Sequence, residues 1–130
     1  MPVVEYRWRF DTGVVDDDHV EGLLDDFHVD VFNRSTEPIT VEVTVYKLIH
    51  DQPASVIQTL TKTILPDSNN WFTIDVPEQI NENFLVVLKH NGDDKDDLLA
   101  TVYGRDKNEK AISSATYRHT ELLKTELLIA

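Results

Sequence analysis

Two groups of aspartates are the residues of this chain whose type and spacing could perform chemistry. Asp16, Asp17 and Asp18 are consecutive, and Asp94 and Asp96 belong to a second acidic segment over residues 90–97. Hard cations such as Ca²⁺ are bound by six to eight oxygen atoms, which loops distant in sequence can supply together. These five aspartates are therefore candidate Ca²⁺ ligands, and solvated acidic loops are the alternative interpretation.

Histidine beside carboxylate is the second chemical feature. His28 and Asp30 are two residues apart, which places them on one face of a strand, and His19 follows three aspartates. Such pairs can bind Zn²⁺ or act as a base with its orienting group. Five scattered histidines make these neighbours common by chance, and no zinc-protease, nucleophile-elbow or phosphate-loop motif is present. We expect no catalytic residues and no cofactor.

Aromatic and terminal apolar residues are the candidates for an interface. Amphipathic aromatic side chains suit interfaces, because they bury a large area and keep a polar tip. The aromatic residues that could stack on a sugar or a partner are Trp8, Tyr6, Tyr46, Trp71, Tyr103 and Tyr117. Core packing is the expectation for both tryptophans. The predicted interface residues are Tyr46, Tyr6, Leu127 and Ile129, the last two because an apolar chain end needs covering.

The elements that position these residues are predicted to be strands. Apolar and polar residues alternate with period two, and the density of Val, Ile and Thr disfavours helix. Turn residues separate the segments. The strands are expected over residues 4–10, 27–33, 39–49, 55–65, 71–76, 84–89 and 98–104, with one or two more between residues 112 and about 128.

Three segments allow more than one interpretation. Asp16 could cap a short helix containing Val20, Leu23 and Leu24, which Gly22 would weaken. Residues 120–128 have helix-favouring composition, but their leucines would spread around a helix, so we predict a strand. Asn33-Arg34-Ser35 matches a glycosylation acceptor, and the backbone preference of Asn for turns is the favoured reading.

Composition limits the class of protein. The 130 residues suffice for one domain over residues 1–130, and an apolar fraction of 41% with 28% charged residues is typical of a globular chain. There is no cysteine, and the net charge is −12. This charge would repel phosphate, so nucleic acid and anionic membranes are poor partners. No secretory signal or bilayer-spanning stretch is recognisable, so we expect a soluble protein whose compartment is unknown.

These strands predict an all-β protein, an antiparallel β-sandwich of about seven to nine strands. Residues 29–89 carry a resemblance: Val29-Asp30-Val31-Phe32-Asn33, then Thr40 to Tyr46, then Leu65-Pro66-Asp67 and Trp71 to Pro77. This order of strands and turns resembles the immunoglobulin-like or fibronectin type III-like domains of bacterial surface and envelope proteins. The resemblance implies an immunoglobulin-like, Greek-key scaffold for adhesion, assembly or packing.

The sequence therefore favours a non-catalytic protein-interaction or structural module that associates with a protein or with itself through sheet edges. The first alternative is a calcium-dependent binding module. The chain resembles the calcium-dependent C2 sandwich in its size and in having acidic loops. The second is an enzyme with a site of dispersed carboxylates and histidines, whose separation the sequence does not define.

Overall fold

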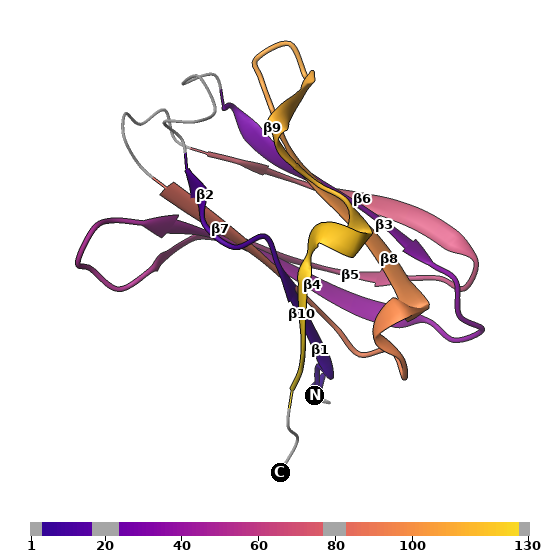
Figure 1. The fold of residues 1–130 in the computed structure, drawn as a ribbon. Coiled ribbons are helices and arrows are strands. Elements are labelled where there is room, and N and C mark those ends of the chain that lie inside the picture. Colours follow the sequence, from indigo (N-terminus) through magenta and orange to yellow (C-terminus); the bar gives the residue numbers. More distant parts are fainter. Residues whose placement is uncertain (1–3, 17–23, 77–82, 128–130) are drawn as a thin grey trace.

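The computed structural model describes residues 4–16, 24–76 and 83–127 of the chain (Figure 1). Strands dominate this part, and the only helices described in it are two short 3₁₀ turns, η2 and η3. In chain order the elements are β1 (Trp8–Asp11), β2 (Val15–Asp16), β3 (Asp26–Asn33), β4 (Ile39–Leu48), β5 (Ser55–Ile64), β6 (Ser68–Asp75), β7 (Asn83–His90), η2 (Lys95–Asp97), β8 (Leu98–Arg105), β9 (Ala111–Tyr117), η3 (His119–Glu121) and β10 (Leu123–Glu126).

The strands form two antiparallel sheets that pack face to face (Figure 1). Sheet A has the order β10-β1-β7-β4-β5, and β2 also pairs with β7; sheet B has the order β6-β3-β8-β9. The predicted antiparallel β-sandwich is confirmed. The described strands exceed the expected seven to nine because Asp16 ends a two-residue strand instead of capping a helix. Residues 17–23 of that candidate helix lie outside the described residues.

Alternating residues of the long strands fill the space between the sheets. On β4, Val41, Val43 and Val45 are fully buried, whereas Thr40 and Glu42 are partly exposed on the opposite face. Sheet B contributes an apolar row from its own inner face. Phe27 of β3 packs edge to face against Phe84 of β7, with 5.8 Å between the ring centroids. Each such side chain contributes roughly 1.5–3 kcal/mol by leaving water, so the period-two pattern fixes which face of each strand is internal.

The turn between β3 and β4 is organised by Asn33, whose side chain is buried. Its amide nitrogen donates to the carbonyls of Glu37 (2.7 Å) and Ile64 (3.0 Å). Its amide oxygen accepts from the backbone and the hydroxyl of Ser35 at 2.9 and 2.8 Å. The predicted turn role of Asn33 is therefore confirmed, and the buried amide is not available as a glycosylation acceptor in the folded chain.

The strand predicted for residues 120–128 is found over β10, Leu123–Glu126, whereas residues 119–121 form the 3₁₀ turn η3. η3 carries the chain from sheet B to sheet A, where β10 pairs with β1 through Trp8–Glu126 to Asp11–Leu123. β1 itself lies between β10 and β7. The first strand is thus internal, and it is shorter than the predicted residues 4–10.

One ion pair is built into the outer face of sheet B. Arg105 of β8 donates two hydrogen bonds to the carboxylate of Asp26 on the neighbouring β3, at 2.8 and 3.0 Å. Both side chains are largely shielded from solvent. The bonds to Asp26 raise the pKa of Arg105 further above its ordinary value. Removing one partner would leave a desolvated charge without compensation.

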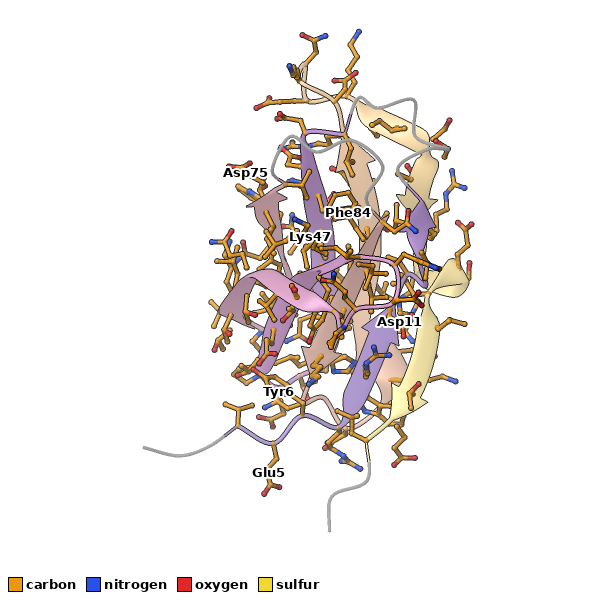
Figure 2. The ribbon with its side chains drawn as sticks, turned by 90° about the vertical axis from the view of Figure 1, so that its left-hand side faces the viewer. Glu5, Tyr6, Asp11, Lys47, Asp75 and Phe84 are labelled. Atoms are coloured by element: carbon orange, nitrogen blue, oxygen red, sulfur yellow. The ribbon has the colours of Figure 1, made fainter. Side chains whose placement is uncertain are left out.

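Asp26→Ala should lower the free energy of unfolding by about 3 kcal/mol, because Arg105 then loses both acceptors. Urea denaturation followed by circular dichroism would measure this loss. The matched control is Asp75→Ala on the edge strand β6, because Asp75 lies opposite Asp26 in the ladder and is exposed (Figure 2). The control should change stability by less than about 0.5 kcal/mol. Equal losses in the two variants would contradict the assigned role of the ion pair.

Candidate functional site

The aspartates that the sequence suggested as Ca²⁺ ligands are not brought together. Asp16 pairs with Asn83, the first residue of β7, whereas Asp94 and Asp96 follow His90, its last residue. The eight residues of β7 separate the two groups by about 24 Å, at roughly 3.4 Å per residue. A Ca²⁺ site shared by Asp16 with Asp94 and Asp96 is therefore excluded. Asp17 and Asp18 lie outside the described residues.

The acidic loop over residues 91–97 uses its carboxylates for its own structure. The Asp94 side chain accepts from the backbone N–H of Asp96 (2.8 Å), and the Asp97 side chain accepts from that of Asp94 (3.1 Å). These two bonds form a capping box at η2. Asp96 accepts from Nε2 of His119 at 2.9 Å, and this bond is the main reason why the pKa of Asp96 is lowered.

A smaller hollow of about 370 Å³ lies beside this loop and is lined in part by Glu37, Asp93 and Asp97. In residues 4–16, 24–76 and 83–127, however, no three His, Asp or Glu side chains are grouped closely enough to hold a metal ion. The acidic side chains that line the hollow are therefore not arranged to bind a metal ion.

Adding millimolar Ca²⁺ should leave the melting temperature unchanged, because the oxygens of Asp94, Asp96 and Asp97 already accept hydrogen bonds within the protein. A site occupied at a hundred times its dissociation constant would instead stabilise the fold by about 2.7 kcal/mol. Differential scanning calorimetry with CaCl₂ and with EDTA distinguishes the two results. A clear upward shift with Ca²⁺ would show that another set of oxygens forms a site.

Two histidines fasten the acidic loop to the core. His90 is completely buried; its Nδ1 accepts from the Gly92 N–H at 3.0 Å and its Nε2 donates to the Lys95 carbonyl at 3.1 Å. His119 accepts from the Ala100 N–H at 3.2 Å while it donates to Asp96. Both rings meet Phe10 edge to face, at 5.2 and 5.6 Å between centroids. A Cβ on residue 92 would lie 3.0 Å from the His90 ring, so glycine permits the close approach.

Burial lowers the pKa of His90 to about 4, because the charged imidazolium loses its hydration. The folded chain then holds His90 neutral at a pH where the unfolded chain protonates it. The contribution is fully present above pH 6.5 and is lost as the pH falls toward 4, since only the unfolded state takes up the proton in that window. The acceptor role of Nδ1 toward Gly92 requires the neutral ring as well.

Stability should fall by about 3 kcal/mol between pH 7 and pH 4 through His90 alone, at about 1.4 kcal/mol per pH unit of displaced pKa. Urea midpoints at closely spaced pH values would record the decline. In His90→Asn, whose amide oxygen can still accept from Gly92, overall stability drops but the slope between pH 6.5 and 4.5 should flatten. An unchanged slope would assign the pH dependence to other groups.

His28 and Asp30 do share a face, as the sequence predicted, and they belong to a larger polar network. His28 Nε2 lies 3.0 Å from Asp30 Oδ1, and Tyr103 donates its hydroxyl to Asp30 Oδ2 at 3.1 Å. The other ring nitrogen of His28 lies 3.1 Å from the hydroxyl of Thr73. Burial, followed by the charge of Asp30, raises the pKa of Tyr103. The network therefore fixes the Asp30 carboxylate on the outer face of sheet B.

This chain of hydroxyl, imidazole and carboxylate has the groups of a nucleophilic site. His28 and Thr73, however, do not line the adjacent groove, and they lie within the ladders of three neighbouring strands. A nucleophile at Thr73 would have no cavity to hold a substrate. The geometry supports a positioning role for His28 rather than a catalytic one.

A groove with a volume of about 550 Å³ lies beside this network. Two rows of side chains cross β6, β3 and β8: Trp71-Asp30-Thr101 and Asn69-Phe32-Leu99. Asp30, Asn69, Phe32, Leu99 and Thr101 line the groove, which the segment from Thr116 to Thr120 borders on its far side. The ladder between β8 and β9 has ended there, so His119 satisfies the Ala100 N–H in place of a strand.

Trp71 departs from its predicted place in the core. It is 53% exposed, because its neighbours Phe72 and Ile74 occupy the internal positions of β6 and alternation turns Trp71 outward. Trp71 is the ladder partner of Asp30, which lines the groove, and the Lys62 ammonium lies 5.8 Å from the centre of its ring. Trp8 does pack against the core, as predicted, and its indole N–H donates to the Gly92 carbonyl at 3.0 Å.

The predicted interface residues lie on sheet A or beyond the described residues. Tyr46 is half-buried on the outer face, opposite Leu85. Tyr6 is half-buried, with its hydroxyl bonded to Glu42 and Thr61, and burial followed by Glu42 raises its pKa. Figure 2 shows Tyr6 near Glu5 at one end of the sandwich. Leu127 is partly buried and donates its N–H to Arg7; Ile129 lies outside the described residues.

Comparison with known proteins adds no identification: no protein-family model matches the chain, and no curated protein matches it significantly. Within the described ranges, no helix has the length and apolar character needed to cross a membrane. Function must therefore be inferred from the edges, faces and grooves of the sandwich.

Proposed function

We propose that this chain is a non-catalytic structural module that joins a second copy of itself through the outer edge of β5. The observation that carries this proposal is the edge itself. β5 spans ten residues and forms its ladder with β4 alone. On its other side, every second residue directs its backbone N–H and C=O groups away from the sheet. An additional strand can pair with these groups.

The length of β5 distinguishes it from the other edges, and it carries little charge. Lys62 is its single charged residue, in a chain with 28% charged residues. The Lys62 ammonium turns toward β6, donating to the Trp71 carbonyl at 2.5 Å and lying 5.2 Å from the centre of the Phe72 ring. This contact leaves the β5 edge without a projecting charge and occupies a carbonyl on the edge of β6.

The other three edge strands are shorter: β6 has eight residues, β9 seven and β10 four. In β10, Lys124 and Glu126 are charged. β9 pairs with β8 over a short, irregular register. Charges and short length are the devices by which sheet edges avoid other chains. β5 is long, and its one charge is engaged by β6.

Two copies of β5 can pair antiparallel without conflict between side chains. A two-fold axis at Leu60 places Thr59 opposite Thr61 and Gln58 opposite Lys62 of the second copy. Thr–Thr pairs stabilise a sheet by roughly 0.2–1 kcal/mol each, and no like charges meet. The net charge of −12 opposes association at long range, so added salt should favour the dimer.

The order of strands supports the immunoglobulin-like architecture that we propose for this scaffold. β3 and β6 are neighbours in sheet B, while β4 and β7 are neighbours in sheet A. Strands B and E, and C and F, have this relation in immunoglobulin domains. β1 then occupies the place of strand G beside β7, and β8 the place of strand A beside β3. The first and last strands of the pattern have thus exchanged positions along the chain.

Val56→Lys should abolish the dimer, because it introduces a charge on the β5 edge at a residue that is 58% exposed. Sedimentation equilibrium over a hundredfold range of concentration, at low and high salt, would measure the association. The matched control is Leu123→Lys, which makes the same change at a residue 61% exposed on the opposite edge of sheet A.

The control variant should associate like the natural chain. A chain that remains monomeric at every concentration and salt level would refute self-assembly. Equal effects of the two lysine substitutions would refute the assignment to β5.

A further inference from the structure

We infer that the groove on the outer face of sheet B binds a neutral carbohydrate. This site lies on the sheet opposite to the proposed self-association edge, and it does not depend on the formation of a dimer. Its floor is lined by Asp30, Thr101, Asn69, Phe32 and Leu99. Trp71 is the ladder partner of Asp30 on the edge strand β6 and flanks the floor without lining it. The segment Thr116–Thr120 closes one side.

Phe32 in the floor and Trp71 on the flanking strand present aromatic surface of the kind that packs against a sugar ring. Trp71 exposes about half of its surface on an edge strand, and Phe32 lies in the adjacent row. The Lys62 ammonium is 5.8 Å from the centre of the Trp71 ring, which restrains the indole by a cation–π contact. A rigid aromatic plane gives contact area at low entropic cost, and the C–H face of a pyranose is flat and apolar enough to use it.

Polar groups surround this aromatic surface in fixed positions. Each oxygen of the Asp30 carboxylate accepts one hydrogen bond, from His28 or from Tyr103, and each has further acceptor capacity. The hydroxyls of Thr101 and Thr116 and the amide of Asn69 line the same groove. A carboxylate that is already held in place accepts a sugar hydroxyl without the cost of ordering a free side chain.

The charge balance of the groove selects a neutral ligand. Asp30 and Arg118 are its charged lining residues and have opposite signs. The ring nitrogen of His119 that accepts from Ala100 marks a neutral imidazole. The net charge of −12 repels polyanionic ligands. Among the described residues, no three metal-binding side chains are grouped to hold a cation that could bridge such a ligand. A volume of about 550 Å³ falls within the usual range for small-ligand sites, roughly 300–1,000 Å³.

Affinity electrophoresis in native gels tests the inference with named probes: a soluble β-glucan, a xylan and a mannan, with polygalacturonate as the anionic counterpart. At least one neutral polymer should retard the natural chain, and polygalacturonate should not. Trp71→Ala should weaken the retardation about tenfold, because the stacking surface is removed. Asp30→Asn preserves the shape of the side chain and should also weaken it, through loss of the charged acceptor.

The control is Leu123→Ala, which removes a comparably exposed apolar side chain from sheet A and should bind like the natural chain. Melting curves would establish that each variant is folded. Absence of retardation by all three neutral polymers, or unchanged retardation in both Trp71→Ala and Asp30→Asn, would overturn the inference. Repeating the gels with the dimer-breaking Val56→Lys variant separates loss of assembly from loss of the groove.

Discussion

Burial of alternating apolar side chains between two sheets is the interaction on which this structure depends. On β4 the valines enter the core and the threonines leave it, and a shift of one residue in register would exchange the two sets. The same alternation places Trp71, Asp30 and Tyr103 outside when Phe72, Val29 and Val102 are inside. The polar network and the groove of sheet B are therefore consequences of core packing, with no separate element devoted to them.

The loops are held by hydrogen bonds that reach into this core. Asn33 binds one turn from within, and His90 and His119 bind the acidic loop from either side of Phe10. Buried polar groups of this kind cost free energy unless every donor and acceptor is satisfied, and here each ring nitrogen has a partner. The acidic loop thus acts as a strap across the end of the sandwich, and its carboxylates are parts of that strap rather than free ligands.

Much of the fold was predictable because period-two patterning records burial directly. The segments around Val41 and Val86 needed no further information. Pairing partners were not predictable, because alternation shows which face of a strand is buried without showing which strand lies beside it. The separation of Asp16 from Asp94 follows from such pairing, through opposite ends of β7. The exposure of Trp71 was readable from Phe72 and Ile74, but the general tendency of tryptophan to be buried suggested the reverse.

The burial of His90 could have been predicted from its position in the sequence. His90 occupies the internal position next in phase after Phe84, Val86 and Leu88, and a polar residue in such a row must satisfy its ring nitrogens locally. Gly92, two residues later, supplies one partner. Only part of the network of His28, Asp30 and Tyr103 could be predicted from the sequence. His28 and Asp30 are two residues apart, whereas Tyr103 joins them only through the pairing of β3 with β8.

The pairing of β1 with both β7 and β10 also governs when the sandwich can form. Its partners lie some eighty and more than a hundred residues further along the chain. Closing such long loops costs entropy before any contact compensates for it, so topologies of this kind fold slowly. During synthesis the ribosome must release the chain through β10 before sheet A is complete. Until then β1 exposes Trp8 and Phe10, a segment that a chaperone is suited to shield.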